Sequence, residues 1–168
     1  EERHSRLPAL YEVLLAAATD LDERVALLRK LVAVTGGPLG DRAAALSHAR
    51  TAYDLVPDQE NLEALEQASR AASAWGPFVE ALRARLASAG ELDPSHARAL
   101  RKKLASAFAT ELGQLDDAAG EYKQLVLEDP SDLETLREFD QLLRGAERAA
   151  DLRWLFEPRV READPDGR

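Results

Sequence analysis

The chain has 168 residues with a formal net charge of −9, and it contains neither cysteine nor methionine. An acidic protein repels phosphate backbones, so we expect no nucleic-acid ligand, and a chain without cysteine can form neither disulfides nor thiolate metal sites. No apolar run is long enough for a membrane span or a signal peptide, which favours a cytoplasmic protein without membrane insertion.

The composition predicts helices throughout the chain. Apolar residues make up 45% of it, and many of them are Ala and Leu, which favour helix over strand. Apolar residues recur at steps of three and four, and glycine or proline interrupts the pattern. We therefore predict nine helices and no strand. The first covers residues 7–18, and the other eight form pairs at about 22–34 and 41–55, 62–72 and 79–86, 97–112 and 115–125, and 133–143 and 149–160.

Four prolines divide the chain into repeats of similar length. They are Pro57, Pro94, Pro130 and Pro165, and they are almost evenly spaced along the sequence. Proline ends a helix, and the polar residues near it suit the start of the next one. A regular period of this kind predicts a helical repeat array. We expect the repeats 22–57, 58–94, 95–130 and 131–165 to form one domain over residues 1–168. The lack of methionine suggests that this domain was excised from a larger protein.

A longer period lies on top of the first. The first and third repeats agree when the numbering is shifted by 73, and the second and fourth agree at a shift of 71 through residues 62–65 and 133–136. Gly, Lys and Pro agree at the first shift, which the Ala- and Leu-rich composition alone does not explain. The matched pairs of the first and third repeats include Leu27–Leu100, Lys30–Lys103, Gly40–Gly113, Ala45–Ala118 and Pro57–Pro130.

The third repeat carries the best-defined motif. Gly113 stands at the break between two helices, Ala118 in the second helix, Tyr122 one helical turn later and Pro130 at the end. This pattern resembles the tetratricopeptide repeat (TPR) family. The resemblance implies a right-handed α-α solenoid of about four helical hairpins plus one extra N-terminal helix. It also implies a concave face, lined by the first helix of each hairpin, that binds a peptide or protein.

The same resemblance implies a set of peptide-binding residues. They are Leu27, Lys30, Leu100, Lys103 and Ala107. Some tetratricopeptide domains grip a C-terminal carboxylate with lysines at the places of Lys30 and Lys103, together with nearby asparagines. Val34 and Ala107 occupy the asparagine places here. We therefore expect a looser attraction to acidic or C-terminal segments.

The last helix offers a second candidate surface. Ala149, Leu152, Phe156, Val160 and Ala163 share one stripe of a helical wheel and are predicted to pack on the preceding helix. Trp154 lies opposite this stripe. It either folds back locally, which a bend at Pro158 would allow, or stays open at the end of the array. We favour the second, because an apolar side chain outside the packed stripe predicts an interface edge, which a further repeat or a partner covers.

No motif for catalysis, a cofactor or a metal is recognisable. His4, His48 and His96 fall in widely separated elements, so they lack metal-ligand spacing. Aspartates at 20/22, 116/117, 129/132 and 164/166 are expected to cap helices.

The basic cluster at 98 and 101–103 is either a solvated helix face or part of a binding surface. We therefore expect a non-enzymatic module that binds a protein or peptide. The alternative is a structural spacer or oligomerisation arm without a groove ligand.

Overall fold

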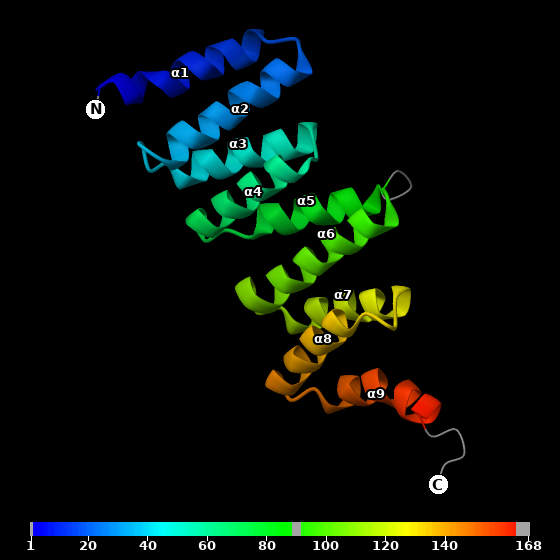
Figure 1. Ribbon diagram of the computed structural model, residues 1–168. Helices are drawn as coiled ribbons and strands as arrows, with labels where there is room; N and C mark the ends of the chain where they lie inside the picture. The colour runs from blue at the N-terminus through cyan, green and yellow to red at the C-terminus, as the bar shows by residue number, and fades with distance from the viewer. Residues whose placement is uncertain (1, 89–91, 164–168) are drawn as a thin grey trace. The chain divides into compact units, whose positions relative to one another are not determined.

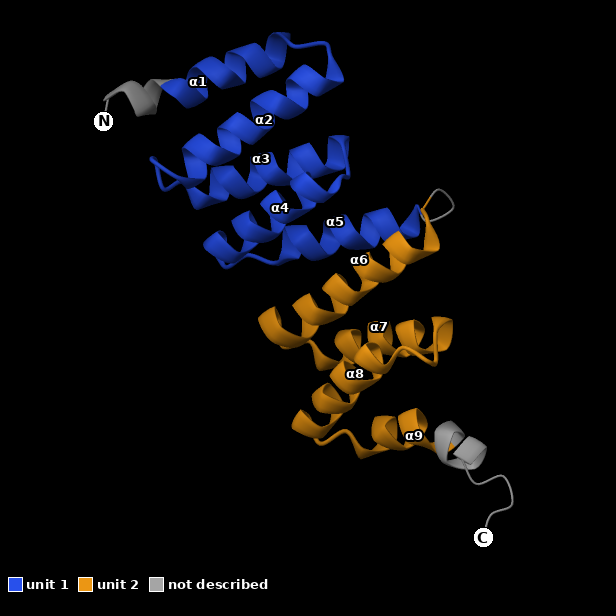
Figure 2. Cartoon of the chain, in the orientation of Figure 1, with its two compact units in different colours: residues 1–90 blue, residues 91–168 orange. Residues whose placement is uncertain are grey.

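The computed structural model describes residues 2–88 and 92–163, with side chains over 7–88 and 92–157, so the repeat end expected at Pro165 lies outside the described residues. Within these ranges the chain forms nine α-helices and no strand, which confirms the all-α prediction (Figure 1). The chain divides into two compact units, unit 1 over residues 1–90 and unit 2 over residues 91–168 (Figure 2). The helices are α1 (Glu2–Ala17), α2 (Leu21–Gly36), α3 (Arg42–Leu55), α4 (Gln59–Ala72) and α5 (Gly76–Ala87) in unit 1, and α6 (Pro94–Ser106), α7 (Leu115–Glu128), α8 (Leu133–Gly145) and α9 (Ala149–Ala163) in unit 2.

Unit 1 packs its helices in chain order. Each of α1 to α4 contacts the helix that follows it, and α2 also contacts α4, as α3 contacts α5. The core between them is aliphatic, with Leu31, Leu65 and Leu82 completely buried. Trp75 packs edge-on against Phe78, with ring centroids 5.4 Å apart. Burial of these large apolar groups is the main driving force for the packing.

Unit 2 has an aromatic centre. Phe139 of α8 is fully buried, stacks on Tyr122 of α7 at 5.4 Å and meets Trp154 of α9 edge-on at 6.4 Å. Leu143 and Leu155 complete the same core. Phe139 therefore contacts aromatic rings of both α7 and α9.

Aspartates begin several helices. Asp20 accepts a hydrogen bond from the Glu23 amide at 2.9 Å at the start of α2, and Asp132 caps α8 in the same way. The capping role predicted for these two residues is confirmed. The expected end of the second repeat at Pro94 falls instead on a helix start, since Asp93 caps α6 and Pro94 is its first residue. Proline suits that position because the first amides of a helix have no helical partner.

The turn after α2 is wider than an ordinary helix end. The Leu39 amide donates to the Val34 carbonyl at 3.3 Å, and the Asp41 amide donates to the Thr35 carbonyl at 2.8 Å. Gly40 lies between the two donors with φ at +66°, a conformation that a residue with a Cβ rarely adopts.

The same turn recurs at the equivalent place in unit 2. Helix α6 continues into a π-helical segment, Ala107–Glu111, where the Leu112 amide donates to the Ala107 carbonyl at 3.1 Å. The Gln114 amide then donates to the Phe108 carbonyl at 2.8 Å, and Gly113 has φ at +64°. The match between the first and third repeats that the sequence predicted thus corresponds to matching backbone hydrogen bonds.

Gly113→Ala should destabilise the protein by about 1 kcal/mol, because alanine is strained at this positive φ. No atom lies within 4 Å of a Cβ placed there, so the loss reports backbone strain alone. Gly120→Ala is the matched control. Gly120 lies exposed inside α7 with equally open space, so its replacement should stabilise by about 0.5–1 kcal/mol. Urea denaturation measures both, and changes of the same sign would contradict the assignment.

The ends of α4 and α8 form a second matching pair. The Ala74 amide donates to the Ser69 carbonyl at 3.0 Å, and the Arg148 amide donates to the Leu143 carbonyl at 2.9 Å. These bonds correspond at a shift of 74 in the numbering, and the predicted shift of 71 is wrong. Leu133, which the predicted shift paired with the buried Leu62, is 65% exposed. The error is nearly one helical turn, so a wrongly shifted comparison still matches apolar positions.

Candidate functional site

Three of the five predicted peptide-binding residues lie in the cores of their units. Leu27 is 5% exposed, Leu100 is 1% exposed and Ala107 is 4% exposed. These side chains are buried because the apolar stripe of an amphipathic helix faces the core of its own unit. Buried side chains of this kind offer almost no surface to a peptide.

The two lysines of the set are more accessible. Lys30 of α2 is exposed, and its Nζ lies 5.9 Å from the centroid of the half-buried Tyr11 ring of α1. This distance allows a cation–π contact, which holds the ammonium group near the α1–α2 surface. Lys103 of α6 is half-buried and belongs to unit 2. Lys30 therefore offers unit 1 an exposed positive charge.

The remaining basic residues of α6 make ion pairs within unit 2. Their partners come from α7, from α8 and from the N-cap of α8. The pairs include Arg98–Asp132 at 2.6 Å, Arg101–Glu121 at 2.9 Å and Lys102–Glu134 at 2.8 Å. A partner protein would have to displace these carboxylates to use the charges. The structure therefore favours a structural role for this cluster over a binding surface.

Asp132 is the most strongly perturbed carboxylate of this cluster. Its pKa lies far below the usual range because Arg98 and then Thr135 donate hydrogen bonds to it, although partial burial opposes the shift. The pKa of Lys102 is raised: burial alone would lower it, but the hydrogen bond to Glu134 and the charge of Asp132 outweigh that effect. Both groups therefore remain charged at neutral pH.

A matching set of ion pairs joins α2 to α4 in unit 1. In unit 1 a basic residue of α2, and in unit 2 a basic residue of α6, pairs with the N-cap aspartate of the second helix after it, α4 or α8, and with the glutamate two positions later. The pairs are Arg29–Asp58 at 3.0 Å and Arg29–Glu60 at 2.7 Å in unit 1, and Lys102–Asp132 at 3.4 Å and Lys102–Glu134 at 2.8 Å in unit 2. Arg29 and Lys102 correspond at a shift of 73 in the numbering, the shift that also relates Gly40 to Gly113. The aspartates and glutamates correspond at a shift of 74, the shift that relates the end of α4 to the end of α8. Sequence comparison missed this match because Arg29 and Lys102 differ in type.

Trp154 is partly covered within unit 2. It is 36% exposed, its ring makes an edge contact with Phe139, and Lys123 Nζ lies 5.5 Å from the ring centroid. The ring therefore contacts both the buried Phe139 and the side chain of Lys123. This arrangement is intermediate between the predicted interface edge and a core residue.

The packed face of α9 differs from the predicted stripe. Leu155 is 1% exposed and belongs to the core, whereas Phe156 is 39% exposed. Leu152 is partly buried against that core, as expected. The side chains of Val160 and Ala163 lie outside the described residues. The helix is rotated relative to the prediction, because Trp154 takes part in the contact with Phe139 and brings Leu155 inward.

An apolar face of α1 was not anticipated. Leu10 is 53% exposed, Val13 is 67% exposed and Leu14 is 42% exposed. Residues at these spacings share one face of a helix. No other helix of unit 1 covers it within the described residues, since α1 makes its main contact with α2. The spacing of these apolar residues predicted a helix over residues 7–18 but did not show that this face of it would be exposed.

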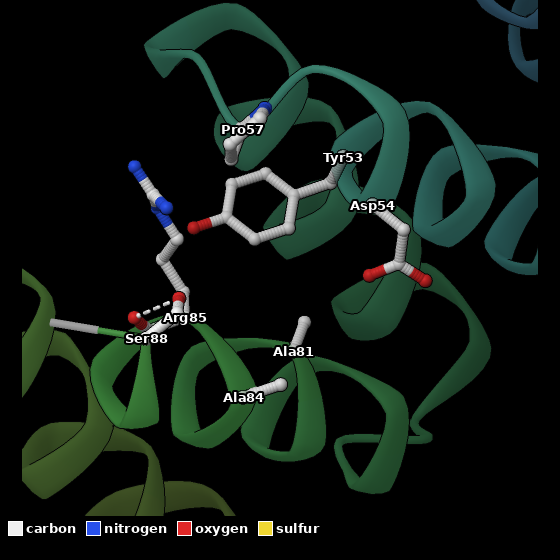
Figure 3. A pocket seen from close by; sticks show the side chains of 7 residues that line it. All are labelled: Tyr53, Asp54, Pro57, Ala81, Ala84, Arg85 and Ser88. Carbon is white, nitrogen blue, oxygen red and sulfur yellow. Dashed lines mark hydrogen bonds between the residues drawn. The ribbon is translucent and has the colours of Figure 1, made fainter. Parts of the chain in front are cut away.

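A pocket opens between the end of α3 and the end of α5 in unit 1. It has a volume of about 210 Å³, and its wall includes Tyr53, Pro57, Ala81, Ala84 and Arg85. Figure 3 shows the Tyr53 ring reaching from α3 across the pocket, with its hydroxyl toward the Arg85 side chain of α5. The only hydrogen bond drawn among the lining side chains is that from Ser88 Oγ to the Arg85 carbonyl at 2.9 Å.

Two polar atoms at this pocket lack partners. The Tyr53 hydroxyl and the Arg85 Nε are buried, and neither makes a hydrogen bond within the described residues. Tyr53 as a whole is 2% exposed. Burial raises the pKa of Tyr53, and the neighbouring Arg85 charge only partly offsets this effect. The phenol therefore stays protonated at neutral pH and retains its proton as a hydrogen-bond donor.

The described residues contain no group of three His, Asp or Glu side chains that could hold a metal ion. Over the same part of the chain, every helix is too short or too polar to cross a bilayer. Comparisons with protein-family models, curated proteins and solved structures give no match.

Proposed function

We propose that this chain is a non-enzymatic protein-interaction module, built as a tetratricopeptide-like array of helical hairpins that binds a protein or peptide. The observation that carries the proposal is the internal repeat. The interhelical ion pairs of Arg29 and Lys102 and the wide turns at Gly40 and Gly113 recur at equivalent places in the two units. Equivalent contacts recur in this way when hairpins of the same kind stack on one another, and stacked hairpins offer extended binding surfaces.

The hydrogen bonds that the Asp132 carboxylate makes within unit 2 support a binding role over catalysis. Enzyme sites bring a nucleophile or base together with groups that stabilise developing charge. The strongly perturbed carboxylate here, Asp132, is occupied by Arg98 and by the amides that begin α8. The Asp132 carboxylate therefore stabilises a helix start and is not available for proton transfer.

The proposed partner carries negative charge near its contact with α2. Lys30 is the exposed cation of the predicted set, and Tyr11 beside it supplies apolar contact area. An acidic segment can pair with this ammonium group while its apolar residues lie against the ring. The proposal keeps Lys103 as the equivalent position of unit 2.

The test selects peptides from a random displayed library with the full chain as bait. We expect Asp- and Glu-rich peptides to be enriched. The double variant Lys30→Glu/Lys103→Glu should bind them about tenfold more weakly and with a flatter salt dependence, because opposite charges no longer attract. Arg83→Glu, an exposed charge reversal on α5, is the control and should leave the affinity within about twofold. Failure to enrich any peptide, or equal binding by the double variant, would contradict the proposal.

The apolar face of α1 favours the alternative of an oligomerisation arm. Leu10, Val13 and Leu14 could pack against the same face of a second copy. Sedimentation of the chain and of Val13→Glu distinguishes the two functions. The alternative is favoured if the parent chain is a dimer, Val13→Glu is a monomer, and the parent chain selects no peptides.

A further inference from the structure

We propose that the pocket between α3 and α5 is a binding site for a carboxylate group carried on a short apolar stem, with the Tyr53 hydroxyl and the Arg85 guanidinium as its hydrogen-bond donors. This goes beyond the proposed function, because a free carboxylic acid would fit the same chemistry. If a peptide supplies the carboxylate, the site deepens that function and rests on it.

The polarity of the missing partner follows from Arg85. An arginine Nε only donates hydrogen bonds, so its partner must be an acceptor, and a protonated phenol, which can donate as well as accept, can donate to the same acceptor. Both atoms are buried without an acceptor, a state that costs free energy until an acceptor arrives. Figure 3 shows Tyr53 and Arg85 reaching toward each other from α3 and α5, so one anionic group can serve both donors.

The internal repeat shows that the fold does not require the Tyr53 hydroxyl. In the register that matches Gly40 with Gly113, its counterpart in unit 2 is Val126, which is 5% exposed and belongs to the core beside Tyr122 and Leu125. An aliphatic side chain therefore satisfies this position in one copy. The other copy carries a buried hydroxyl without a partner, and this difference points to a ligand.

The charge and size of the pocket favour a carboxylate over a phosphate. Arg85 is the one basic residue among the lining side chains, and it suits a single negative charge. Asp54 on the opposite wall pairs with Arg50 at 2.8 Å, which moderates its repulsion but would still disfavour a dianion. The volume of about 210 Å³ admits a group of a few heavy atoms, and Pro57, Ala81 and Ala84 provide apolar contact for its stem.

Nuclear magnetic resonance titration of the full chain with sodium butyrate tests the site. We expect amide shifts to concentrate at residues 53–57 and 84–88. Butyramide, which has the same shape without the charge, should leave them unmoved, as should sodium chloride at equal ionic strength. Equal shifts with butyramide, or shifts centred elsewhere, would overturn the proposal.

Two variants assign the donors. Tyr53→Phe and Arg85→Gln should each weaken butyrate binding about tenfold or more, the usual effect of losing a hydrogen bond to a charged group. Arg83→Gln, on the same helix and exposed, is the matched control and should bind as the parent does. Unchanged affinity in Arg85→Gln refutes the site, and the circular dichroism spectrum of each variant confirms that it is folded.

Thermal unfolding without ligand gives an independent check. Tyr53→Phe should be as stable as the parent, or more so, because it removes a buried hydroxyl without a partner. A drop of several degrees would mean that the hydroxyl is already bonded, for instance to a buried water, and would overturn the proposal.

The source of the carboxylate is resolved with peptides. Acetyl-Ala-Leu with a free C-terminus is compared with its amide and with acetyl-Ala-Glu-amide. Tighter binding of either peptide acid than of butyrate assigns the site to partner recognition, and equal binding assigns it to small carboxylic acids. Binding of none of these acids overturns the site. The proposed function, which is tested through Lys30 and Lys103, would still stand.

Discussion

Replacement of Phe139 by alanine should destabilise unit 2 by about 3–5 kcal/mol, the largest effect expected for a single side chain of that unit. Phe139 is completely buried and joins α8 to Tyr122 of α7 and Trp154 of α9. Its removal leaves a cavity among three helices and also takes away two ring contacts. Urea denaturation followed by circular dichroism measures the loss.

Phe156→Ala is the control for Phe139→Ala. Phe156 lies in the same unit but is 39% exposed, so its truncation should cost less than about 1 kcal/mol. The apolar stripe predicted for α9 from the sequence placed Phe156 in the core, and it therefore implies a large loss for Phe156→Ala. A larger loss in Phe156→Ala than in Phe139→Ala would show that α9 is rotated as the sequence pattern suggested.

Neutralising Asp132 should produce the second-largest effect. Asp132→Asn keeps an N-capping side chain for α8 but removes the charge that Arg98 and Thr135 contact. We expect a loss of about 2 kcal/mol at neutral pH, since the Asp132 side chain is only 18% exposed and Arg98 would be left without its closest carboxylate. Denaturation of the two proteins side by side measures the difference.

The pH dependence gives this prediction its sign. The pKa of Asp132 is lower in the folded protein than in the unfolded chain, so folding is favoured by its ionised form. This stabilisation is fully present above the unfolded pKa of about 3.9 and is lost as the pH falls toward the folded pKa. The difference between wild type and Asp132→Asn should therefore shrink below about pH 4. A difference that stays constant in acid would contradict the ion-pair explanation.

Asp58→Asn in unit 1 provides the matched comparison. Asp58 occupies the equivalent N-cap and pairs with Arg29, but its side chain is 42% exposed. Solvent screens this pair, so we expect a cost below about 1 kcal/mol. The contrast between the two aspartates separates the effect of burial from that of the cap.

The sequence predicted the helices and their breaks because these depend on local chemistry. Gly40 and Gly113 adopt positive φ values that glycine tolerates. The carboxylates of Asp20 and Asp132 accept hydrogen bonds from the first backbone amides of a helix. Such features act within about one helical turn, where the chain alone decides the conformation. The number of helices predicted for the described part of the chain follows from them.

The faces of the helices and the candidate sites were harder to predict. Leu27 and Leu100 were assigned to a binding surface because a family register was applied, whereas both side chains are buried in their own units. Leu155 was missed because its burial depends on how Trp154 meets Phe139, a contact between different helices. The pocket of Tyr53 and Arg85 joins residues of two helices that are not consecutive, and no spacing rule of a single helix brings them together.

The matching turns and ion pairs give the chain an internal alignment of two sequences. Positions that agree in both copies, such as Leu31 with Leu104 and Pro57 with Pro130, mark what the architecture demands. Positions that differ while the backbone hydrogen bonds stay the same mark where the architecture tolerates different side chains. In this comparison each half of the chain serves as a reference for the other, and each pair that differs, such as Tyr53 and Val126, names a substitution to be tested in the fold.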